Sequence, residues 1–178
     1  MCNNRSTENC TGGNSTWQNN KLIVVIEAQI GNEGLLKLRK TAFLCSRQVP
    51  ASTVLKCYDW AIAQREAGNC VISGFHSTIE KDVLHYLLRG KQPIIIALAR
   101  SLKQQIEPMF KIPMEEGRLL FVAPFGDDVK RVTSKTAMLR NKMMIELTDQ
   151  ITVGYASKDG QLEKLLCTTK KAIQYITR

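Results

Sequence analysis

Short apolar runs alternate with stretches of helical periodicity along most of the chain. One long run covers residues 21–30, and shorter runs cover residues 42–45, 70–73, 93–99, 119–123 and 151–155. Short strands that are apolar on both faces and separated by helices are typical of a parallel sheet with helices on both sides. The pattern predicts a Rossmann-like, doubly wound α/β fold with three α/β/α layers, in which the five shorter runs are parallel neighbours.

Helical periodicity follows most of these runs. Helices are expected between Pro50 and Gly68, over 78–89, over about 133–147 and from Gln161 onwards. A further short helix, capped by Ser101, is expected to end near Pro113. The first of these helices carries apolar side chains at Val54, Leu55, Tyr58 and Ile62.

The turn from Ser73 to Ser77 joins a predicted buried strand to a predicted helix. Ser77 and Glu80 stand at the spacing of a capping box, which by itself is a structural feature. A strand that turns through Gly74 into a helix N-terminus also forms a nest of backbone N–H groups that fits a phosphate. The turn therefore predicts an anionic ligand.

Small, hydroxylated and cationic residues follow the other predicted strands as well. Ser46-Arg47, Arg100-Ser101 and the segment 124–126 each come directly after an apolar run. The carboxyl ends of parallel strands meet at one edge of the sheet, where ligands of such folds bind. These residues are therefore expected to gather around the ligand.

The chain is basic: 178 residues carry 25 Lys and Arg against 16 Asp and Glu, a formal charge of +9. Such a balance suggests an anionic partner, although a basic solvated surface is the alternative. On a helix, residues 131, 135 and 142 would share one face. A basic track that follows a phosphate backbone is predicted at Lys130, Arg131, Lys135 and Lys142.

The cysteines and the N-terminal segment indicate the compartment and the domain organisation of the protein. The six cysteines form no metal-ligand pattern, and Cys45 and Cys70 are predicted to be small buried residues in a reducing compartment. Residues 1–20 predict a disordered or loosely ordered tail, and 21–178 a single domain. No apolar segment has the length of a membrane span, and a cytoplasmic protein is expected.

Catalytic patterns are absent from the sequence. His76 and His85 stand nine residues apart without a partner cluster, and no nucleophile elbow, Walker loop or full dinucleotide fingerprint occurs. His76 lies in the glycine turn and is the better ligand-binding candidate of the two. No cofactor, metal site or catalytic residue is predicted.

Three segments resemble DNA-processing protein A (DprA/Smf), whose pattern runs Gly-Ser-Arg, Ser-Gly-x-Ala-x-Gly-Ile-Asp and Arg-Asn-Arg. The corresponding residues here are Cys45-Ser46-Arg47, the segment from Ser73 to Glu80, and Arg140-Asn141-Lys142. Cys45 and Thr78 replace two glycines of the family pattern, and the resemblance covers roughly residues 22–166. It implies a stand-alone Rossmann-like core that binds single-stranded DNA.

A weaker resemblance links residues 140–164 to nucleotide phosphoribohydrolases of the lysine-decarboxylase-like group. The segment 159–164 matches only the second half of that group's Pro-Gly-Gly-x-Gly-Thr-x-Glu-Glu pattern, with Glu163 as the sole acid/base candidate. Such an enzyme, or a sensor of a nucleotide derivative, remains the alternative function.

Single-stranded nucleic acid is the leading predicted partner, followed by a free nucleotide, and a homodimer is left open. The residues predicted to contact phosphate are Ser46, Arg47, Ser73, Gly74, Phe75, His76, Ser77, Arg140 and Asn141.

Overall fold

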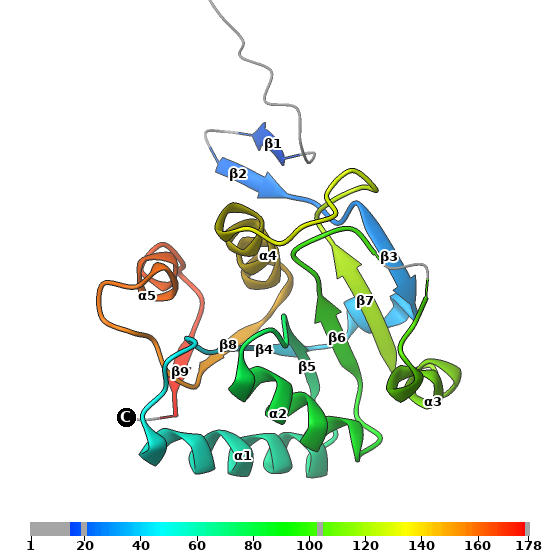
Figure 1. Ribbon diagram of the computed structural model, residues 1–178, viewed down its shortest axis with the longest axis vertical. Coiled ribbons are helices and arrows are strands. Elements are labelled where there is room, and N and C mark those ends of the chain that lie inside the picture. Colours follow the sequence, from blue (N-terminus) through cyan, green and yellow to red (C-terminus); the bar gives the residue numbers. More distant parts are fainter. Residues whose placement is uncertain (1–14, 19–20, 103–104, 177–178) are drawn as a thin grey trace, which may run out of the picture.

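A seven-stranded sheet forms the centre of the computed structural model, which describes residues 15–18, 21–102 and 105–176 (Figure 1). The strand order is β3-β7-β6-β5-β4-β8-β9. Every neighbouring pair is parallel except β3 and β7. The strands are β3 (Ala28–Gly31), β4 (Lys40–Leu44), β5 (Cys70–Ser73), β6 (Ile94–Ala97), β7 (Leu119–Ala123), β8 (Gln150–Val153) and β9 (Ile173–Tyr175).

The five central strands confirm the predicted parallel sheet. All four residues of β5 and of β6 are buried, as expected for strands covered on both faces. Two apolar clusters lie on opposite faces of the sheet. One includes residues of α1 (Ala51–Glu66) and α2 (Thr78–Leu88), and the other residues of α4 (Ser134–Leu147) and α5 (Gln161–Leu166). The molecule therefore has the three predicted layers.

The helix α1 occupies the predicted segment but buries a different face. Its buried residues are Thr53, Cys57 and Ala61, whereas Leu55 is 68% exposed. Small side chains on this face let the helix approach both the sheet and the neighbouring α2 (Figure 1). The ring of Trp60 stacks on Phe43 of β4 with centroids 4.8 Å apart. No helix within the described ranges is long and apolar enough to cross a membrane.

The N-terminal apolar run is two strands rather than the predicted one. Strand β2 (Lys21–Val24) pairs antiparallel with β1 (Ser15–Gln18) in a separate hairpin, and β3 begins at Ala28. β3 is an antiparallel edge strand, and β9 adds an edge that was not predicted. β1 lies inside the predicted tail, residues 1–20, most of which falls outside the described residues. The predicted boundary between this tail and a single domain over 21–178 stays a prediction.

The short helix predicted after Ser101 is wrong in its position. The backbone N–H and the hydroxyl of Ser101 both donate to the carbonyl of Val129, so this side chain ties two loops together instead of capping a helix. Among the described residues that follow Ser101, helical structure starts at the 3-10 turn η2 (Pro108–Phe110) and continues as α3 (Lys111–Glu115). A second 3-10 turn, η1 (Glu33–Lys37), precedes β4.

Two of the buried cysteines pack against the chain directly after β8. Cys45 and Cys70 are buried as predicted, and Cys57 joins them in the core. A hydrogen bond with Cys57, together with burial, raises the pKa of the Cys45 thiol well above its usual range, so it stays neutral. A Cβ added at Gly154 would lie 2.9 Å from Sγ of Cys57 and 3.0 Å from Sγ of Cys45. Glycine is therefore required there by space.

Gly154→Ala is expected to lower the free energy of unfolding by about 1–3 kcal/mol, because an extra methyl overpacks a filled core. Chemical denaturation measures this difference. Gly126→Ala is the matched control, since its added Cβ would have its nearest contact at 3.6 Å, with Oδ1 of Asp128. Equal stability of the two variants would contradict the packing described for Gly154.

Candidate anion-binding site at the carboxyl edge of the sheet

Two adjoining hollows lie where the central strands end. The polar hollow, about 870 Å³, is enclosed by the loops that follow β4, β5 and β8 and by the start of α4. The apolar hollow, about 520 Å³, is lined mainly by residues around the ends of β5, β6 and β7 and by η2. His76, Val132 and Arg140 line both. The two hollows therefore adjoin at these residues, and the pair is called the groove below.

The carboxylate of Glu80 fills the backbone nest that the sequence assigned to a phosphate. The N–H groups of His76 and Ser77 donate to its Oε2 at 2.8 and 3.2 Å, and the N–H of Cys45 donates to Oε1 at 3.3 Å. The hydroxyl of Ser77 in turn accepts from the N–H of Glu80, which completes the predicted capping box. These N–H groups already have an acceptor, so a ligand must bind through other groups.

Arg140 forms the wall between the two hollows. Its side chain is only 6% exposed, and Nη1 donates to the carbonyl of Ala97 at the end of β6. The guanidinium lies directly against Gly74, where an added Cβ would overlap Nη1 and Cζ. The absence of a side chain at Gly74 thus makes room for a buried cation rather than for a phosphate. Burial lowers the pKa of Arg140, but a guanidinium stays charged.

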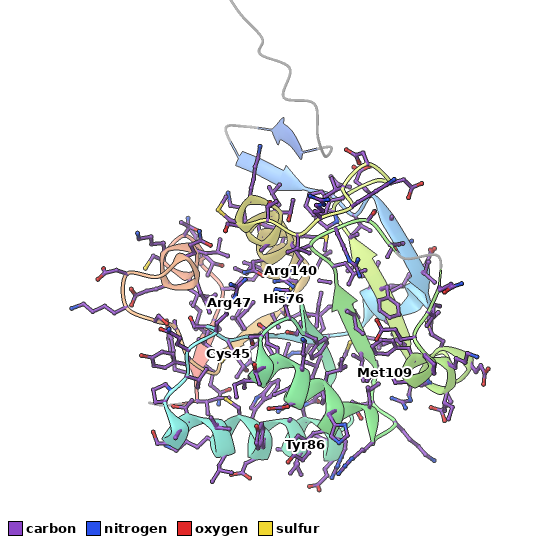
Figure 2. The ribbon with its side chains drawn as sticks, viewed as in Figure 1. Cys45, Arg47, His76, Tyr86, Met109 and Arg140 are labelled. Carbon is purple, nitrogen blue, oxygen red and sulfur yellow. The ribbon has the colours of Figure 1, made fainter. Side chains whose placement is uncertain are left out.

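The turn that carries His76 has an unusual backbone. Phe75 adopts a φ of +45°, a left-handed conformation that is strained for an aromatic residue, while its ring is buried. Such strain persists only where the surroundings impose it, often at functional sites. The conformation leaves His76 exposed at the boundary of the two hollows, with Arg47 and Arg140 nearby (Figure 2).

The polar hollow is electropositive. Partial burial of the ring lowers the pKa of His76 below its ordinary value of 6.5, and the guanidinium charges of Arg140 and Arg47 lower it further. Lys81 acts in the same direction, and Glu80 opposes it. The N-terminal ends of α2 and α4, with Ser77 and Thr133 as capping residues, add partial positive charge. The hollow is therefore suited to an anion.

Most of the predicted phosphate contacts come together, although not all of them. Ser46, Arg47, His76, Ser77, Arg140 and Asn141 line the polar hollow, and Gly74 and Phe75 line the apolar one. Ser73 is fully buried and lines neither, because its hydroxyl accepts from the N–H of Phe75. The basic track, Lys130, Arg131, Lys135 and Lys142, also lies outside both hollows.

Three hydroxyl residues in the polar hollow were missed, namely Thr133, Ser134 and Ser157. Thr133 could have been found from its place before the basic helix, where it forms a capping box with Thr136. The N–H of Ser157 donates to the hydroxyl of Ser46, so the loops after β4 and β8 are joined at the rim. No sequence signal marks that contact, because the two residues are 111 positions apart.

Glu163, the acid/base candidate of the alternative enzyme, does not line the polar hollow, although its neighbours Gly160 to Leu162 do. Its carboxylate accepts a hydrogen bond of 2.7 Å from the backbone N–H of Asp159. This contact gives Glu163 a structural role at the start of α5.

Comparison with known proteins identifies the fold. DNA processing protein A from Streptococcus pneumoniae superposes with a TM-score of 0.65 and 17% identity, over 83% of this chain and 53% of that one. The DNA processing protein A of Helicobacter pylori, whose structure describes a single-stranded DNA binding mode, superposes with a TM-score of 0.66 and 18% identity. The match covers 83% of this chain and 69% of that one. The predicted resemblance is thus confirmed for the fold, and the chain spans about half the length of the pneumococcal protein. No family model and no curated protein matches the chain.

Removing a guanidinium from the polar hollow is expected to raise the pKa of His76. In Arg47→Ala the imidazolium loses one repulsive neighbour, so protonation becomes easier. A pH titration of the His76 ring by NMR measures the shift. Arg39→Ala, which removes the same charge from the residue before β4, is the control and should leave the His76 titration unchanged. A fall in the pKa of His76 in Arg47→Ala would contradict the electrostatics described above.

Proposed function

We propose that this protein binds single-stranded nucleic acid through the groove at the carboxyl edge of its sheet. One phosphate occupies the polar hollow, and an adjacent base lies in the apolar hollow. The observation that carries the proposal is the convergence of Arg47, Arg140 and His76 around the polar hollow. The buried carboxylate of Glu80 in this hollow already accepts hydrogen bonds from backbone N–H groups.

The charge balance of the polar hollow supports a phosphate ligand. Among the described residues, neither Arg47 nor Arg140 forms a salt bridge within 4.0 Å, so both guanidiniums keep their charge available. A guanidinium binds phosphate through paired, charge-assisted hydrogen bonds. A buried cation without an anionic partner is costly, and a bound phosphate would offset that cost.

The apolar hollow supports a base beside that phosphate. Its walls include Phe75, Leu84, Ile106, Met109 and Phe121, and Met109 is 50% exposed at its rim near α3 (Figure 2). Apolar and aromatic side chains stack on any base with little sequence preference. The groove is therefore suited to a nucleotide unit that spans both hollows.

A nucleic-acid strand is favoured as the ligand over a free nucleotide, because basic residues continue outside the groove. Lys130, Arg131 and Lys135 are exposed before and at the start of α4. A mononucleotide would not reach them, whereas a strand leaving the polar hollow would pass near the same end of α4. The hydrolase alternative is not favoured, since Glu163 is engaged with Asp159. A homodimer stays a prediction.

Arg47→Ala should weaken binding of a single-stranded oligonucleotide roughly ten- to a hundredfold, since a charge-assisted hydrogen bond contributes about 1.5–3 kcal/mol. Arg47→Lys should recover only part of the affinity, because an ammonium cannot form the paired contact. Fluorescence anisotropy at constant salt measures both variants.

Arg39→Ala is the matched control for Arg47→Ala, because it removes the same charge from an exposed residue at the opposite edge of the sheet. If the two alanine variants lose affinity equally, net charge explains binding and the polar hollow does not.

Lys135→Ala should cost less affinity than Arg47→Ala and should reduce the salt dependence. Loss of one phosphate contact on a single strand lowers the slope of log K against log salt by about 0.7. Binding measured from low to high salt gives this slope, and binding of a mononucleotide should hardly change. An unchanged slope for the oligonucleotide would remove Lys135 from the proposed path of the strand.

A further inference from the structure

We propose that the polar hollow takes a terminal phosphomonoester, the phosphorylated end of a strand, in preference to an internal phosphodiester. This inference rests on the proposed function, since both place a phosphate in the polar hollow. It goes further by naming which kind of phosphate binds there.

The number of charges in the hollow is the first reason. Arg47 and Arg140 provide two guanidiniums, and His76 can accept a third positive charge. An internal phosphodiester carries a single negative charge, whereas a phosphomonoester carries about −1.5 to −2 at neutral pH. The Glu80 carboxylate offsets one of these positive charges, which leaves one net positive charge when His76 is neutral and two when it is protonated, and the monoester matches the protonated state.

The arrangement of hydroxyl groups around the hollow is the second reason. Hydroxyl groups face it from four separate segments, represented by Ser46 after β4, Ser77 after β5, Thr133 before α4 and Ser157 after β8. The apolar hollow continues from it past His76 and Arg140 and provides a path for one ester substituent. A monoester offers three terminal oxygens to the surrounding donors, whereas a diester offers two and places its second substituent where the third oxygen would lie.

Arg140 distinguishes this site from an ordinary helix N-terminus. Its side chain is more than nine-tenths buried, and its Nε has no hydrogen-bond partner among the described residues. A charged group buried with an unused donor is costly unless a further acceptor or anion is present. Arg140 is one of the residues that line the polar hollow. This arrangement points to an anion that completes the charge balance of Arg140.

Protonation of His76 links binding to pH. The charged groups around its ring are Arg47 from the loop after β4, Arg140 from α4, and Glu80 and Lys81 from α2. Partial burial and the three cations hold its pKa below 6.5 in the free protein, Glu80 opposes them, and a bound dianion would raise it. Proton uptake on binding means that affinity for a terminal phosphate increases as pH falls from 8 toward 6.5. The increase ends where the phosphate itself gains a proton, near pH 6.

The test compares three oligonucleotides of one sequence, carrying a 5′-phosphate, a 3′-phosphate or hydroxyls at both ends. Competition against a labelled strand at constant salt measures their affinities. At least one phosphorylated strand should bind about tenfold more tightly than the hydroxyl-ended strand, the equivalent of one charge-assisted contact. Equal affinity of all three would overturn the terminal-phosphate proposal and leave the proposed function standing. Failure of all three to bind would overturn the proposed function itself.

A variant at His76 separates this role from a purely structural one. In His76→Gln the ratio between phosphorylated and hydroxyl-ended strands should fall, and its increase between pH 8 and pH 6.5 should disappear. His85→Gln is the matched control, because His85 is exposed on α2, contacts Arg89 and lines neither hollow. Circular dichroism confirms that both variants fold. If His76→Gln keeps the wild-type ratio at every pH, the proposed selectivity is wrong.

Discussion

The hydrogen bonds of the Glu80 carboxylate hold the loops after β4 and β5 in a fixed relation at the carboxyl edge. One oxygen accepts from two N–H groups at the start of α2, and the other accepts from the N–H of Cys45 at the end of β4. Two loops that are 35 residues apart in the chain are thereby held in one arrangement. Without this acceptor, each buried N–H group would cost about 1–3 kcal/mol, so the position of Arg47 and His76 depends on it.

The same interaction explains why the site is electropositive although a carboxylate lies at its centre. The charge of Glu80 is satisfied by backbone dipoles, which leaves the guanidiniums of Arg47 and Arg140 to act on the groove. Arg140 still gains from Glu80, whose charge partly offsets the burial of the guanidinium. The glycine turn, which resembles a phosphate-binding loop in sequence, therefore works by accommodating a buried arginine against Gly74.

The groove has a polar and an apolar half because different strands end beneath each half. Loops after β4 and β8 bring Ser46, Arg47 and Ser157, whereas β6, β7 and η2 bring Leu98, Phe121 and Phe110. Since β4 lies between β5 and β8, the polar loops are neighbours in space. Arg140, from α4 above the sheet, lies at the boundary and contacts the end of β6. A ligand with one charged and one apolar part matches this division.

The sequence by itself determined the features that depend on near neighbours in the chain: the buried parallel strands, the helices after them, and the capping box of Ser77 and Glu80. It did not predict the antiparallel β3 or the edge strand β9, whose pairing depends on partners far along the chain. Tertiary structure alone decided that Glu80 also bonds Cys45, that Arg140 is buried on Gly74, and that the basic track lies outside the groove. Periodicity and capping reflect contacts within a few residues, whereas burial and charge pairing depend on which distant segments the sheet order brings together.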